Sequence, residues 1–132
     1  MIINYIGMSV SELGIIPTVT IDNKGVFKYI LIEVEDKSGD KRVFVRGSEK
    51  FEFHKENFVS FFSELKKYNI DKKQYRIKCP GGGRISISDK QTMSIYGYSK
   101  SYGLGDHLKA KELIKQESCF RDFIIETSNE GY

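Results

Sequence analysis

Alternating apolar and polar side chains give the strongest strand signal of the chain, over residues 26–34. Because side chains alternate across a strand, Lys28 shares one face of it with aliphatic neighbours. Those neighbours are Val26, Ile30, Ile32 and Val34. The short β-branched run 18–21 and the turn 22–25 precede this strand, and a loop over 36–40 leads to a returning strand over 41–45. The pattern predicts a short strand followed by an antiparallel hairpin.

A 3.6-residue period of apolar positions predicts a helix over residues 55–68. Its apolar stripe consists of Phe58, Phe61, Phe62, Leu65 and Tyr68. His54 comes directly before this helix, at or near its N-cap. Asp106 is the expected N-cap of a second helix, which continues to Ile114.

The remaining segments read as strands. Residues 75–79 are extended, Pro80 and the glycines up to Gly83 are expected to interrupt the strand, and 84–88 continue it. Strands are also predicted over 91–98 and 121–127, with a glycine-containing loop over 99–105. The fold class is therefore α/β (α+β), with a single mixed, largely antiparallel sheet of about six strands packed by two main helices.

Composition narrows the class of protein. A chain of 132 residues, 39% of them hydrophobic, fits a single globular domain. Two cysteines, Cys79 and Cys119, form no disulfide framework and no metal-ligand set, and the chain shows no signal peptide and no apolar run of membrane-spanning length. We expect a cytoplasmic monomer without a membrane partner. The net charge of +3 is too mild to predict nucleic-acid binding, although a basic stretch over 66–78 keeps that alternative open.

Candidate chemistry centres on His54, one of only two histidines. A helix start stabilises anions, and an imidazole beside a bound phosphate is a possible general base or nucleophile. The simpler interpretation is that His54 only caps the helix. Lys28 either extends its ammonium to water or points into an anion pocket, and Arg84 is either a solvated strand residue or a phosphate ligand. The Ser99-Lys100-Ser101 loop offers donors but is also an ordinary loop.

Several motifs stand in a fixed order and together resemble the small protein phosphohistidine phosphatase family, also called janus/ocnus. They are Gly25-Val26-Phe27-Lys28-Tyr29-Ile30-Leu31-Ile32, Val45-Arg46-Gly47, Phe53-His54, Cys79-Pro80-Gly81-Gly82-Gly83-Arg84-Ile85-Ser86, Ile95-Tyr96-Gly97-Tyr98-Ser99 and Asn129-Glu130-Gly131-Tyr132. The resemblance covers residues 15–132 as one domain and leaves 1–14 as an N-terminal extension.

The resemblance implies metal-independent hydrolysis of phosphohistidine in partner proteins, without a cofactor. It places the essential histidine on His54, the strand lysine on Lys28 and the glycine-linked arginine on Arg84. It places the substrate loop on residues 99–101, and it gives His107 a counterpart that is not catalytic. Relatives can carry apolar or small residues where Lys100 and Ser101 stand.

Backbone N–H groups of Phe53, His54, Lys55 and Ser99–Ser101 are expected to hold the phosphoryl oxygens. A non-catalytic module that binds phosphoproteins on the same scaffold is the alternative function.

Overall fold

The computed structural model describes residues 9–130. Its strands are β1 (Val19–Ile21), β2 (Gly25–Glu35), β3 (Lys41–Gly47), β4 (Arg76–Ile87), β5 (Thr92–Tyr96) and β6 (Ile124–Thr127). The α-helices are α1 (His54–Lys67) and α2 (His107–Lys115), and three 3₁₀ turns, η1 (Val10–Ile15), η2 (Lys72–Gln74) and η3 (Ser118–Phe120), complete the elements. Within residues 9–130, no helix has the length and apolarity of a membrane span.

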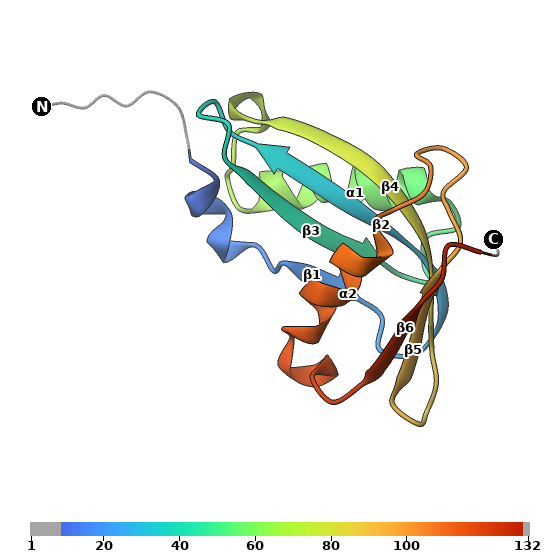
Figure 1. Ribbon diagram of the computed structural model, residues 1–132. Coiled ribbons are helices and arrows are strands. Elements are labelled where there is room, and N and C mark those ends of the chain that lie inside the picture. The colour runs from blue at the N-terminus through green and yellow to red at the C-terminus, as the bar shows by residue number, and fades with distance from the viewer. Residues whose placement is uncertain (1–8, 131–132) are drawn as a thin grey trace, which may run out of the picture.

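The strands form one curved sheet in the order β1-β3-β2-β4-β5-β6 (Figure 1). β1 pairs with β3 and β5 with β6 in parallel, and the three central pairings are antiparallel. This confirms the predicted fold class. The predicted hairpin is β2 with β3, and both predicted helices form within one residue of their expected starts.

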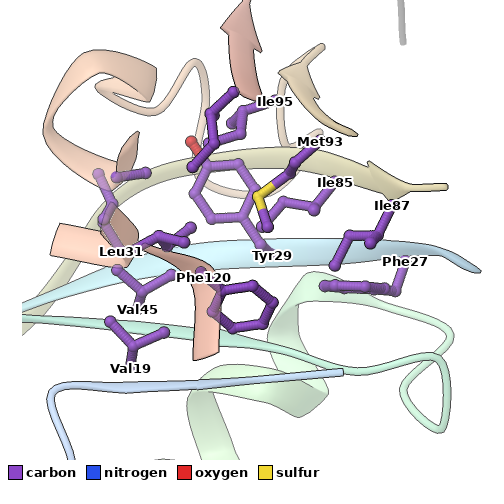
Figure 2. Close-up of a cluster of buried hydrophobic side chains, with 13 residues drawn as sticks. Val19, Phe27, Tyr29, Leu31, Val45, Ile85, Ile87, Met93, Ile95 and Phe120 are labelled. Atoms are coloured by element: carbon purple, nitrogen blue, oxygen red, sulfur yellow. The ribbon is translucent and has the colours of Figure 1, made fainter. Parts of the chain in front are cut away.

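The two helices cover opposite faces of the sheet, with α2 in front and α1 behind in Figure 1. Alternate residues of β2 explain this, since Tyr29 and Leu31 pack in one buried cluster and Ile30 and Ile32 in the other. The α2-side cluster, shown in Figure 2, surrounds Tyr29 with side chains of β4 and β5. The α1-side cluster contains Phe61 and Leu65 of the predicted stripe, beside Phe44, Ile30, Ile32 and Val34.

The expectation that Pro80 and its glycines interrupt a strand is wrong, because β4 runs through them without a break. Gly81, Gly82 and Gly83 pair with Leu31, Ile30 and Tyr29 of β2. The disturbance caused by Pro80 is limited to a register shift opposite Leu31 and Glu33, as expected of a residue without a backbone N–H. The last strand is also shorter than the predicted 121–127, since residues 121–123 form a turn after η3 and β6 begins only at Ile124.

Arg46 joins the start of the sheet to α1. Its buried guanidinium donates two hydrogen bonds to the Glu64 carboxylate, at 2.8 and 3.0 Å, and others to the carbonyl oxygens of Pro17 and Thr18. A forked guanidinium fits such a set of acceptors. Arg46 therefore fixes the position of α1 relative to β1 and β3.

Part of the segment expected to be an N-terminal extension packs on the domain. Leu13 of η1 is fully buried in the α1-side cluster, and the Val10 N–H donates to the Asp36 carboxylate at 2.9 Å. Residues 10–14 therefore contribute to the core, whereas residues 1–8 lie outside the described part of the chain.

Candidate active site

His54 is the first residue of α1, and its side chain points inward, so that the residue is only 6% exposed. Its Nε2 atom lies 2.8 Å from the carbonyl oxygen of Gly83 on β4. Because a carbonyl can only accept a hydrogen bond, Nε2 carries the hydrogen and donates it. In the neutral ring, Nδ1 then holds the lone pair. The ring also lies against Gly82, where an added Cβ would come within 3.2 Å of His54 Cδ2.

The surroundings of His54 favour that neutral ring. Burial is the main cause that lowers the pKa of His54 below its ordinary value, and the positive charges of Lys28 and Arg84 lower it further. The hydrogen bond to Gly83 acts in the opposite direction and does not outweigh them. The imidazole is therefore an uncharged base at neutral pH, with two cations close enough to act on it.

Lys28 and Arg84 face each other across β2 and β4 as directly paired residues of the antiparallel ladder. Paired side chains on one face of a sheet lie about 5 Å apart at Cβ. Both residues are half-buried, on the same side of the sheet as α1. The Lys28 ammonium lies 5.3 Å from the ring centre of Phe53, immediately before α1. The sheet thus brings two cations to the start of the helix that carries His54.

Asn57, which is not among the predicted site residues, connects these elements. It is buried one turn after His54 on α1, and its Nδ2 donates to the backbone carbonyl of Lys28 at 3.3 Å. A polar residue at a buried helical position is the signal that was available. Its amide ties the helix that carries His54 to the strand that carries Lys28.

The start of α1 offers fewer donors than expected. The Phe53 N–H already donates to the Glu56 carboxylate at 2.9 Å, and the Glu56 N–H donates to the Phe53 carbonyl. Within residues 9–130, no acceptor meets the N–H groups of His54 and Lys55. The helix start therefore presents two backbone donors, of His54 and Lys55, and not the N–H of Phe53.

The loop over 99–101 is beside this helix start. Ser101 lines a hollow of about 760 Å³ together with Phe53 and Lys55, and both Lys100 and Ser101 are exposed. Ser99 differs, because it is buried and its N–H donates to the Gly103 carbonyl at 2.9 Å, while its hydroxyl accepts from Tyr102. The backbone donor of Ser99 serves the loop itself, so only the exposed part of the loop can meet a ligand.

The sequence is similar to those of known proteins. The model of the Janus/Ocnus family matches residues 13–123, which include η1 from Leu13 and every candidate site residue. The chain belongs to the Janus/Ocnus family. It is 36% identical to the 14 kDa phosphohistidine phosphatase of Homo sapiens, over 95% of this chain and the full length of that protein. It is also 36% identical to the sex-regulated protein janus-A of Drosophila yakuba, over 95% of this chain and 88% of that protein.

The second histidine of this Janus/Ocnus protein has a structural role. His107 is the first residue of α2 and is buried on the other face of β4 from His54. Its Nε2 donates to the Gly97 carbonyl at 2.8 Å, and its Nδ1 accepts a hydrogen bond from the Tyr29 hydroxyl. Both nitrogens are occupied inside the core, so His107 has none left for a substrate. Asp106 caps α2 as predicted, accepting from the Lys109 N–H at 3.0 Å.

Both histidines predict a loss of stability in mild acid. Burial is the main cause that lowers the pKa of each ring below about 6.5 in the folded protein. Above that pH the rings are neutral in both states, and below it the unfolded chain takes up protons more readily than the folded one. We expect the free energy of unfolding, measured with urea, to fall as the pH is lowered from about 7 to about 5. Hydrogen bonds from Ser38 and Val10 hold the pKa of Asp36 below its usual value, so that carboxylate adds no change in this range. An unfolding free energy that stays constant or rises over this range would contradict the neutral rings.

Proposed function

We propose that this protein is a phosphohistidine phosphatase that hydrolyses the N–P bond without a metal ion or cofactor. The observation that carries the proposal is the neutral imidazole of His54, fixed by Gly83 beside the cations Lys28 and Arg84. The name of the human relative gives the same activity for that protein.

The proposed phosphate site consists of charges and backbone donors that exist before the substrate arrives. Lys28 and Arg84 balance the charge of the phosphoryl group, and the N–H groups of His54 and Lys55 donate to its oxygens. Ser101 lines a hollow together with Lys55, next to these donors. Fixed donors and cations of this kind stabilise charge that develops in the transition state at little reorganisation cost. Phosphoryl transfer needs little more than such positioning.

In the proposed reaction, His54 Nδ1 takes a proton from a water molecule whose oxygen attacks phosphorus. The N–P bond breaks as the substrate imidazole takes up a proton from the solvent, inorganic phosphate remains, and His54 Nδ1 then releases its proton to the solvent. Direct attack of Nδ1 on phosphorus is the other route, and it forms phospho-His54, which water then hydrolyses. Both routes need a neutral ring with its lone pair at Nδ1.

The test is phosphate release from a phosphohistidine peptide, measured with and without a chelator. We expect release at the same rate in both conditions, since Lys28 and Arg84 supply the positive charge. Loss of release with chelator would contradict a metal-independent reaction. Tight binding of the peptide without release would instead support the non-catalytic module.

A further inference from the structure

Part of the α1-side face of the sheet, toward β5 and β6, adds no side chain to the buried cluster under α1. Within residues 9–130, the buried cluster under that helix takes its side chains from β2, β3 and the first half of β4, and none from β5 or β6. Two rows of paired residues cross the remaining area. The first row is Lys28, Arg84 and Tyr96, and the second is Val26, Ser86, Ser94 and Glu126. We call this area the open face.

The open face begins at the proposed phosphate site, because its first row contains Lys28 and Arg84. It is hollowed toward β6, where a cavity of about 550 Å³ is lined by Ser86, Ser94, Tyr96, Glu126, Ser128 and Glu130. The neighbours of Ser94 and Glu126 along their strands, Met93 and Ile125, are buried on the α2 side. Ser94 and Glu126 therefore point to the open face.

Charge divides this surface into two ends. The end on β2 and β4 carries the cations Lys28 and Arg84, and the end on β6 carries the carboxylates Glu126 and Glu130, both exposed. The backbone carbonyl of Glu130 accepts a hydrogen bond from the Gly97 N–H, which holds the chain after β6 against the end of β5. A ligand that matches both ends has a phosphoryl group at one end and positive charge at the other.

We infer that the open face binds the segment of a substrate protein next to its phosphohistidine, and that it selects segments with lysine or arginine. This inference rests on the proposed function and adds the kind of substrate. Charge complementarity identifies the occupant, because serine hydroxyls and Tyr96 line the middle of the surface and carboxylates its far end.

The spacing of the sheet sets the position of the basic residue. Neighbouring strands lie about 4.8 Å apart, so Arg84 on β4 and Glu126 on β6 are roughly 10 Å apart across the sheet. The second row is two residues further along the strands, which adds roughly 7 Å in that direction. The resulting distance of roughly 12 Å corresponds to three or four residues of an extended peptide. We expect selection for a basic residue three or four positions from the phosphohistidine.

The experiment compares peptides that contain one phosphohistidine and differ only at positions three and four from it. Both positions are lysine in one peptide, serine in the second and glutamate in the third. Each peptide is made with these positions before the phosphohistidine and again with them after it. Free phosphohistidine serves as the small substrate. We expect the lysine peptide to have a kcat/KM roughly three- to tenfold above that of the serine peptide at low salt. The preference should decrease with added salt, because both carboxylates are exposed.

The double variant E126Q/E130Q should abolish this preference and leave hydrolysis of free phosphohistidine unchanged. The matched control is E112Q/D122N, which removes the same charge from exposed positions around α2 and should retain the preference. Equal kcat/KM for lysine and serine peptides in the wild type, or a preference that survives in E126Q/E130Q, would overturn the inference.

Failure of the proposed function has a different signature, since no substrate, including free phosphohistidine, would then be hydrolysed. In that case titration with the unphosphorylated lysine peptide still tests the open face. Weaker binding to E126Q/E130Q than to the control supports the inference, and equal binding overturns it. A wild-type dimer in sedimentation that dissociates in E126Q/E130Q would also overturn it, because a second copy would then cover the face.

Discussion

Replacing His54 with alanine is expected to lower the turnover of phosphohistidine by roughly 10²- to 10⁴-fold, the usual contribution of a general base. The reason is the neutral ring beside Lys28 and Arg84, whose Nδ1 is the proposed proton acceptor. The variant should fold, because the substitution removes one hydrogen bond to Gly83, at a cost of about 1 kcal/mol, and the packing of one ring. Turnover per folded molecule is the quantity to measure, with the folded fraction taken from urea unfolding.

His107 provides the matched comparison. It also begins a helix and donates from Nε2 to a backbone carbonyl, but its Nδ1 is occupied by Tyr29. His107→Ala leaves the Tyr29 hydroxyl without its acceptor in the core, which should cost about 2–4 kcal/mol of unfolding free energy. A folded His54→Ala protein with wild-type turnover would remove His54 from the mechanism.

Gly82→Ala is expected to reduce the free energy of unfolding by about 3 kcal/mol, at the upper end for overpacking. A Cβ at position 82 would lie 2.3 Å from the Tyr29 carbonyl oxygen of β2 and 3.2 Å from His54 Cδ2. The first contact is with the backbone of the neighbouring strand, so it is relieved only by moving β2 or β4. Because both strands carry residues of the proposed phosphate site, we also expect lower turnover in the molecules that fold.

Gly14→Ala is the control for this substitution. No atom lies within 4 Å of a Cβ at position 14, on η1, and the backbone there does not need positive φ. The same chemical change should alter the free energy of unfolding by less than about 1 kcal/mol. Urea unfolding of both variants compares the two sites, and equal stability would show that the glycines of β4 do not need their close contacts.

Local patterns were sufficient for most of the fold. The alternation over 26–34 placed Lys28 on the aliphatic face of β2, and the stripe from Phe58 to Tyr68 gave α1, because both depend on neighbours along the chain. The pattern failed at Pro80 and Gly83, where β4 continues. Glycine is a poor strand former in isolation. The glycines of β4 are needed because β2, Leu104 and Gly105 approach them closely, and these neighbours are distant in sequence.

Less of the candidate site could be predicted from the sequence. Residue types indicated His54, Lys28 and Arg84, but the pairing that makes Lys28 and Arg84 neighbours depends on the register of β2 against β4. Sequence patterns also do not predict which acceptor each backbone N–H group meets. The N–H of Phe53 donates to the Glu56 carboxylate, and the N–H of Ser99 donates to the Gly103 carbonyl. These two expected phosphate donors are therefore not available. The acceptor of His54, the Gly83 carbonyl, was not expected at all.

That acceptor has a consequence for sequence divergence. In many enzymes an acidic side chain orients the catalytic imidazole, and a single codon change can delete it. Here the orienting group is a main-chain oxygen, which every amino acid supplies. A substitution can move the carbonyl oxygen of residue 83 by distorting β4, but it cannot remove that oxygen. The tautomer with its lone pair at Nδ1 thus depends on the path of the backbone, and distant relatives can retain it after most of their side chains have changed.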